Sequence, residues 1–190
     1  GNLTVAGSSS SGYGVSLGSS LVNSGNGTLT VLGTSNANDG VYANSSLLVV
    51  NNGTSGNLVL MGNGTAGGIN ATMALDVRNS SNGNMTVQGS GNSWIGIEVS
   101  GANNLTNSGN GTLIYSGLSS ISRGIDVGGS TFNMINNGTS GVLSVVGSGG
   151  GTSHGFFFGG ASATTIQAAS SGNTSLSGIS SGSYGILFVA

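Results

Sequence analysis

The chain has 190 residues, of which 3% are charged, and its net charge is −2. It contains 39 glycines but neither proline nor cysteine. Without cysteine it has no disulfides and no thiolate metal sites, and its weak negative charge argues against nucleic acid, which binds basic surfaces. No apolar run approaches the roughly 18 residues that a membrane-spanning helix needs. We therefore expect no cofactor, no nucleic-acid partner and no membrane insertion.

Glycine columns divide the chain into units of 26 to 31 residues. The units open at Gly1, Gly27, Gly56, Gly83, Gly111, Gly141 and Gly172. Six residues later stand Gly7, Gly33, Gly62, Gly89, Gly117, Gly147 and Gly178. Six to eight residues further on stand Gly14, Gly40, Gly68, Gly96, Gly124, Gly155 and Gly185. The string NSGNGTL also occurs twice, at 23–29 and 107–113. A period of this size indicates stacked supersecondary units.

Apolar residues alternate within each unit, which is the period of a strand and not of a helix. A first strand is predicted at 3–5, 29–31, 58–60, 85–87, 113–115, 143–145 and 174–176. A second strand follows the third glycine, at 15–17, 41–43, 69–71, 97–99, 125–127, 156–158 and 186–188. A looser third segment closes most units, at 47–50, 73–77 and 132–135. Each unit therefore predicts strand, glycine corner, strand, turn and third strand.

Stacking equivalent strands buries apolar sides that one unit cannot bury alone. The predicted fold is all-β: a right-handed parallel β-helix of six full coils and a partial seventh, without a capping helix. It forms one domain over 1–190, with coils starting near 1, 27, 56, 83, 111, 141 and 172. Rows of like charge would repel in such a stack, whereas Asn, Ser and Thr can hydrogen-bond along a row. Glycine is expected to supply the backbone angles of the corners.

Strand patterns begin at the first residues and continue to the final GILFVA. Both ends of the predicted rod therefore expose unpaired strand edges, which are templates for further pairing. We expect the chain to be a segment of a longer rod or a subunit that associates end to end.

The units resemble the glycine-rich β-helical repeats of large bacterial surface adhesins, of the filamentous haemagglutinin-like and autotransporter-passenger type. The resemblance is carried by GNLTVAGSSSSGYGVSL at 1–17, GTLTVLGTSNANDGVYA at 27–43 and GNMTVQGSGNSWIGIEV at 83–99. It extends over essentially the whole chain and identifies a repeat type. It implies an extracellular or cell-surface location and a role as a rod or stalk, with a carbohydrate or cell-surface receptor as a possible partner.

Glu98 and Asp126 occupy equivalent places in neighbouring coils. Two outward acids about 5 Å apart are compatible with glycoside hydrolysis or a calcium ion. Arg123 is close enough in sequence to neutralise them, and we interpret them as a solvated surface pair. Asp76 and Arg78, two residues apart on one strand, predict a local ion pair of small energetic weight.

A variable column precedes the third glycines, and it includes His154, whose expected neighbours are Arg123 and Tyr184. A catalytic histidine needs a nucleophile and an orienting acid, so we interpret His154 as a surface position. The column and nearby Trp94 form a possible weak carbohydrate-binding row of Tyr13, Trp94, Arg123, His154 and Tyr184. We expect no catalytic residue and no metal site.

Asn-x-Ser/Thr sequons are frequent and are possible glycosylation sites. They begin at Asn2, Asn26, Asn44, Asn52, Asn63, Asn70, Asn79, Asn84, Asn104, Asn110, Asn137 and Asn173. The alternative is that a chain so rich in Asn, Ser and Thr contains sequons by accident.

The leading functional hypothesis is a structural component of an extracellular β-solenoid fibre, without enzymatic activity. Binding to ice, another surface or glycan is an alternative, although threonines such as Thr28 and Thr30 do not continue as regular rows. A polysaccharide-active enzyme that uses Glu98 and Asp126 is a third possibility.

Overall fold

The computed structural model describes residues 1–129, 131–160, 163–168 and 171–189. Within these ranges all regular secondary structure is β-strand, and no helix that could cross a membrane is present. The strands form three parallel sheets, two of seven strands and one of six. The predicted all-β solenoid is therefore confirmed, with seven rungs in two sheets and six in the third.

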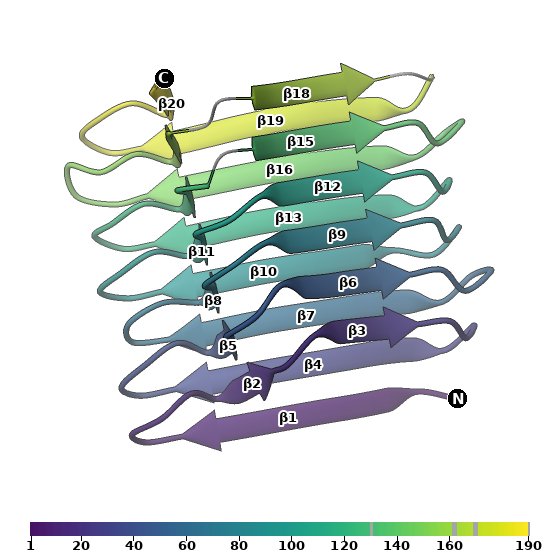
Figure 1. Cartoon of the computed structure of the whole chain (residues 1–190), viewed down its shortest axis with the longest axis horizontal. Coiled ribbons are helices and arrows are strands. Elements are labelled where there is room, and N and C mark those ends of the chain that lie inside the picture. The colour runs from purple at the N-terminus through teal and green to yellow at the C-terminus, as the bar shows by residue number, and fades with distance from the viewer. Residues whose placement is uncertain (130, 161–162, 169–170, 190) are drawn as a thin grey trace.

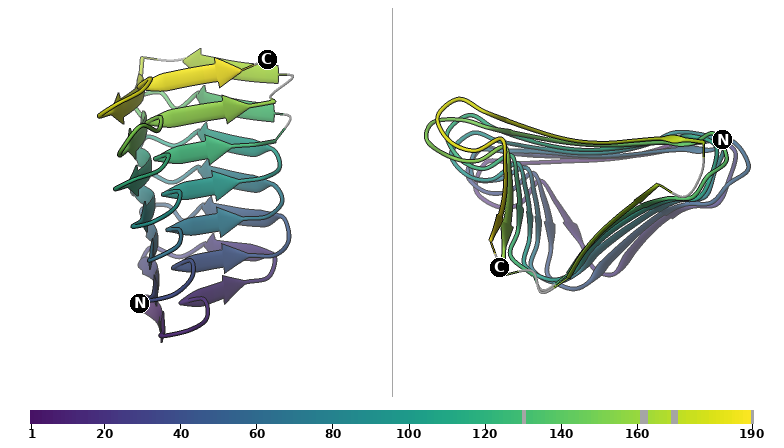
Figure 2. Two further views of the ribbon diagram at one scale, coloured as in Figure 1. Left: turned by 90° about the vertical axis from the view of Figure 1, so that its left-hand side faces the viewer. Right: turned by 90° about the horizontal axis from the view of Figure 1, so that it is seen from above.

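Each of the six full coils contributes one strand to each sheet, and the partial seventh contributes to two. The coil has a narrow triangular cross-section seen from above (Figure 2). Sheet A contains β1 (Leu3–Ser9), β4 (Thr28–Ser35), β7 (Asn57–Gly64), β10 (Met85–Gly91), β13 (Thr112–Ser119), β16 (Val142–Gly149) and β19 (Asn173–Ser180). Sheet B contains β2 (Val15–Leu17), β5 (Val41–Ala43), β8 (Ile69–Ala71), β11 (Ile97–Val99), β14 (Ile125–Val127), β17 (Phe156–Gly159) and β20 (Ile186–Val189). Sheet C contains β3 (Ser20–Asn23), β6 (Leu47–Asn51), β9 (Leu75–Asn79), β12 (Asn103–Asn107), β15 (Thr131–Asn136) and β18 (Ala163–Ala168).

The coils rise from the N-terminus at the bottom to the C-terminus at the top (Figure 1). Seen from above, the chain runs counterclockwise as it rises toward the viewer, so the solenoid is right-handed, as predicted (Figure 2). All three glycine columns lie along the rod as the repeat predicts. The second column is in direct register across sheet A, from Gly7 beside Gly33 to Gly147 beside Gly178.

The glycine columns are required for close approach of backbones and not for special backbone angles. Positive φ occurs among the described residues only at Gly151 and Gly160, outside the columns, so the expectation that glycine supplies the corner angles is wrong. The second-column glycines lie inside the sheet A strands and face the third-column glycines of the same coil. A Cβ on Gly33 would lie 2.0 Å from the carbonyl oxygen of Gly40, and one on Gly89 would lie 2.0 Å from that of Gly96.

The interior is a continuous apolar column, because inward residues of the three sheets meet along the axis. In one coil, for example, the inward residues of all three strands are fully buried: Leu58 and Leu60 on β7, Ile69 on β8, and Leu75 and Val77 on β9. Toward the C-terminal end the filling becomes aromatic, with Phe132, Phe156 and Phe158 packed at ring-centre distances of 4.8–5.5 Å. The coil-to-coil register gives each of these side chains an equivalent neighbour above and below.

A polar pair interrupts this apolar interior in the middle of the rod. The Asn103 amide donates to the Tyr115 hydroxyl at 3.0 Å, and both side chains are fully buried. Burial raises the pKa of the Tyr115 phenol far above its ordinary value, so the group stays neutral.

A buried asparagine ladder closes the corner between sheets C and A. Each rung donates its amide to the side-chain oxygen of the next, at 3.1 Å from Asn23 through Asn107 and 3.3 Å at the last step. The same amides also donate to backbone carbonyls at the corner, such as Gly56 and Gly111. The ladder consists of Asn23, Asn51, Asn79, Asn107 and Asn136. It was not among the predicted features, although the 28- or 29-residue spacing of these asparagines is visible in the sequence.

The glycine contact predicts the effect of a single methyl group. Gly89→Ala would place a Cβ against the backbone of Gly96, which cannot move without displacing the coils on either side. We expect a loss of about 3 kcal/mol, seen as a lower melting temperature, because overpacking of a rigid interior costs this much. Gly18→Ala is the matched control, since its Cβ would meet nothing within 4 Å. Equal melting temperatures for the two variants would contradict the contact.

The asparagine ladder makes a second prediction. Asn79→Leu removes the 3.1 Å bonds to Asn51 and Asn107. The Asn107 side-chain oxygen and the Gly83 carbonyl then lose the donor that Asn79 supplies, whereas the Asn51 amide keeps its bond to Gly56. We expect a loss of roughly 3 kcal/mol in denaturant unfolding, because each unsatisfied buried group costs about 1–3 kcal/mol. The same substitution at Asn82, an exposed asparagine three residues later, should have little effect. A neutral Asn79→Leu would show that the ladder contributes no stability.

Candidate functional site

Most chemically distinctive side chains lie on the outside of sheet B. The residue before each third-column glycine is stacked on its equivalent, since Gly96 donates to the Arg123 carbonyl and Gly124 to that of His154, at 3.1 and 3.2 Å. Beside this column runs the outward row of sheet B. We define the sheet B strip as Trp94 together with Tyr13, Asp39, Gly67, Ile95, Arg123, His154, Tyr184, Ser16, Tyr42, Asn70, Glu98, Asp126, Phe157 and Leu187.

The two predicted acids are neighbours on the strip, because Glu98 on β11 pairs in register with Asp126 on β14. Each carboxylate already has a protein partner. Asp126 forms an ion pair with Arg123, as the sequence suggested, and Glu98 accepts a hydrogen bond from the Trp94 indole at 3.3 Å. A shallow hollow of about 200 Å³ lies over the pair and is also lined by Ser100.

The pKa values of two strip carboxyls are raised, and burial is the main cause for both. For Glu98, the Trp94 hydrogen bond opposes the effect of burial, and the charges of Asp126 and Asp39 add to it. For Asp39, a hydrogen bond from the Asn70 amide at 3.2 Å partly opposes it. Burial disfavours the charged form of a carboxyl group that has no cation beside it, and this raises its pKa.

The aromatic residues of the predicted row fall into separate clusters. Near the N-terminal end, Tyr13 stacks on Tyr42, with ring centres 4.0 Å apart and planes inclined by 4°. Toward the other end, the Arg123 guanidinium lies 3.7 Å from the Phe157 ring centre, and His154 stacks on the same ring at 5.4 Å. Trp94 lies between the clusters and is 53% exposed.

His154 lies beside Tyr184, as expected from the sequence, and it also contacts Phe157 and Ser183, which were not expected. Its ring centre lies 5.9 Å from that of Tyr184, and Arg123 reaches it through Phe157. The Ser183 hydroxyl lies 3.0 Å from its Nδ1 atom. No carboxylate hydrogen-bonds to the ring within the described ranges, so this Ser–His pair has no orienting acid of the kind that activates a nucleophile.

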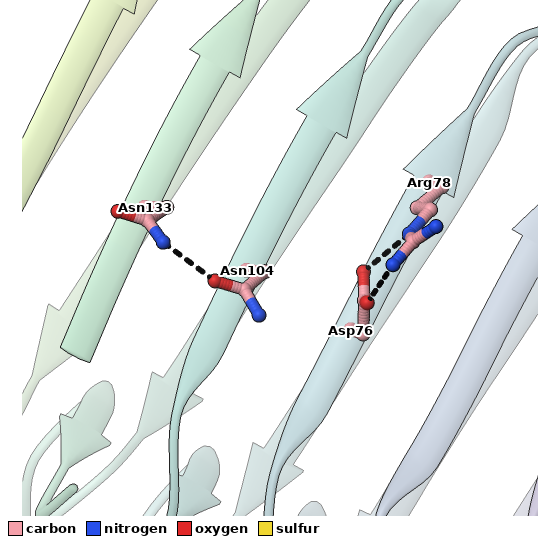
Figure 3. Close-up of polar contacts among 4 residues, drawn as sticks. All are labelled: Asp76, Arg78, Asn104 and Asn133. Carbon is pink, nitrogen blue, oxygen red and sulfur yellow. Dashed lines mark hydrogen bonds and ion pairs between the residues drawn. The ribbon is translucent and has the colours of Figure 1, made fainter. Parts of the chain in front are cut away.

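The outer face of sheet C carries one ion pair and one pair of amides on neighbouring strands (Figure 3). Asp76 and Arg78 form the predicted ion pair on β9, through two contacts of which one measures 2.8 Å. On the next two strands, the Asn133 amide of β15 donates to the Asn104 side-chain oxygen of β12 at 2.8 Å. These residues border an open hollow of about 400 Å³. Such a surface offers hydrogen-bonding groups without a strong electric field.

The sequon asparagines divide by burial. Asn79 is completely buried in the asparagine ladder, so its amide is not accessible to glycosylation in the folded rod. Asn70 and Asn104 are half-buried, and their side chains are hydrogen-bonded to neighbouring coils. The remaining nine are exposed and stay predicted sites: Asn2, Asn26, Asn44, Asn52, Asn63, Asn84, Asn110, Asn137 and Asn173.

Several contacts of the strip were missed because they join residues about 30 positions apart. Tyr42 and Phe157 belong to the outward row of sheet B, and the alternation of apolar residues in that segment would have revealed their direction.

The described residues contain no group of three or more metal-ligating side chains. The chain as a whole is a parallel β-solenoid whose chemistry is displayed on its outer faces. It matches no protein-family model, curated protein or solved structure at a significant level.

The raised pKa of Glu98 predicts how stability depends on pH. A folded-state pKa above the ordinary 4.5 means that the folded chain holds the proton more tightly, so stability falls as pH rises through and above that value. Glu98→Gln mimics the protonated form and should raise the melting temperature at neutral pH. It should also flatten the melting profile between about pH 4 and 7. A residual slope is expected from Asp39, whereas an unchanged profile would contradict the assignment.

Proposed function

We propose that the chain forms the rod of an extracellular fibre, as an adhesin-like stalk at a cell surface. The observation that carries the proposal is the continuous register of three parallel sheets, two through seven coils and the third through six. One backbone cross-section is repeated along the axis, which makes a spacer whose length follows the number of coils. The resemblance to surface-adhesin repeats supports the extracellular assignment.

The two ends of the rod expose apolar side chains and strand edges. At the N-terminal end Leu3 and Val5 are 59% and 44% exposed, and at the other end Phe188 is 49% exposed. Among the described residues, β1 and β19 are the outermost strands of sheet A, and unpaired edges of this kind accept further strands.

Head-to-tail stacking of two identical chains would continue sheets A and B but not sheet C. A second copy would place its β1 on β19 and its β2 on β20. Sheet C would then lack one rung, because it has six strands where the others have seven. Stacking of identical chains would therefore leave a gap of one strand in sheet C at each junction.

We propose a structural and not a catalytic role for the acid pair. Asp126 is already neutralised by Arg123 and Glu98 is bound to Trp94, so neither carboxylate is free for acid–base chemistry. Ice binding is disfavoured by the outer rows of sheet A, where Thr28 pairs with Asn57 and Thr30 with Val59.

Electron microscopy of native material, labelled with antibody against the chain, tests the fibre proposal. We expect label along thin rods outside the cell, much longer than the roughly 30 Å of one chain at about 4.8 Å per coil. Preimmune antibody is the control. Label confined to short isolated particles or to the cell interior would overturn the proposal.

A further inference from the structure

We propose that the outer face of sheet A is an interface at which a second copy of this chain packs face to face, with the two rods antiparallel. This association is lateral and does not depend on the fibre function proposed above. Sheet A has the longest strands of the solenoid, of 7 or 8 residues, and no element covers its outer side (Figure 2).

The area of this face is sufficient for a stable dimer. Seven strands of about 8 residues cover roughly 850 Å², at about 3.3 Å per residue and about 4.8 Å per strand. A standard protein interface buries about 800 Å² on each partner. None of the sheet A strands contains Asp, Glu, Lys, Arg or His, so pairing would desolvate no charged side chain.

A hollow of about 330 Å³ lies off-centre on this face, where β4, β7 and β10 run side by side. Leu32 and Met61 supply its apolar lining, and Thr34, Asn63, Gln88 and Ser90 complete the outward rim. On the other side of β10, the β13 residues Ile114 and Leu118 protrude, being 38% and 36% exposed. The face therefore has a recess on one half and apolar projections on the other.

The central position of β10 brings the two halves together in an antiparallel pair. A two-fold axis along β10, the fourth of the seven strands, places β7 opposite the partner's β13 and β4 opposite the partner's β16. Residues in the same outward row then face each other, which sets Val59 against Ile114 and Leu32 against Val146. Leu118 of one copy lies opposite Asn63 of the other, so that its side chain can enter the partner's hollow. The two-fold symmetry makes each of these contacts twice.

The alternative pairing, with parallel rods, does not match apolar groups in this way. A two-fold axis along the rod keeps each coil opposite itself and reverses the order of the outward rows. The hollow would then face Thr28, Thr30 and Thr86, and its one apolar match would be Val59 opposite Met61. The projections would face polar residues, Leu118 opposite Thr112 and Ile114 opposite Ser116. Self-complementarity selects the antiparallel arrangement, as expected of an isologous dimer.

Sedimentation equilibrium of the purified chain tests the interface. We expect a concentration-dependent mass that reaches twice the 18.2 kDa of the chain and does not rise further. Leu118→Arg should weaken the dimer at least tenfold, because it buries a charge in the partner's hollow, which no acidic side chain lines. Ile135→Arg, a half-buried isoleucine on the outer face of sheet C, is the matched control and should dimerise like the wild type.

A second variant and a cross-link keep the test decisive if Leu118→Arg fails to fold. Leu118→Ser introduces the residue that Ser148 provides in the same row one coil higher, and it should also weaken the dimer. Because the chain has no cysteine, Gln88→Cys should join to itself through a short bismaleimide, whereas Leu32→Cys should join only to Val146→Cys. A monomer at all concentrations, an open-ended polymer, or a dimer unaffected by both Leu118 variants would overturn the proposal, as would Leu32→Cys joining to itself.

Discussion

The in-register parallel ladder between successive coils is the constraint on which the structure depends. Once Leu58 pairs with Met85 and Gly62 with Gly89, every other position of the two coils is fixed opposite its equivalent at about 4.8 Å. A side chain in this fold must therefore tolerate a close neighbour of its own kind. Apolar residues do so by burying each other, and asparagine does so because its amide is both donor and acceptor. A column of carboxylates or ammonium groups would repel, which accounts for a chain with 3% charged residues.

The second and third glycine columns and the asparagine ladder allow the chain to turn at two different corners of the coil. At the corner between sheets A and B the backbones of one coil touch, since a Cβ on Gly62 would lie 2.1 Å from the Gly68 carbonyl oxygen. At the corner between sheets C and A the turn carbonyls point inward and need donors. The amide of Asn107 supplies two of them, to the carbonyls of Gly111 and Val142. One corner excludes side chains, and the other requires a particular one.

The sequence was sufficient for the fold because the repeat encodes register directly. The glycine columns and the alternation of Leu, Val and Ile specified sheets A and B. Sheet C was less clear, because its rows mix apolar and polar residues, with Asn103 paired with Leu75 and Phe132. The role of glycine was misassigned because close backbone approach is a tertiary property, whereas positive φ is the local property usually associated with glycine.

The outer faces were less predictable than the interior, because their contacts depend on side-chain direction and reach across coils. The sequence anticipated that Glu98 would lie beside Asp126 and that Arg123 would neutralise this pair, but it did not show that the Trp94 indole would bond to Glu98. Most interior columns repeat apolar residues from coil to coil, whereas the sheet B strip changes its kind of residue at nearly every coil. Because the backbone has nearly the same course in every coil, the rod can recognise a particular partner only through the side chains that vary along its outer faces. Distinct partners must therefore be distinguished by the order of side chains along a face, and on sheet A that order places recesses and projections on opposite sides of β10.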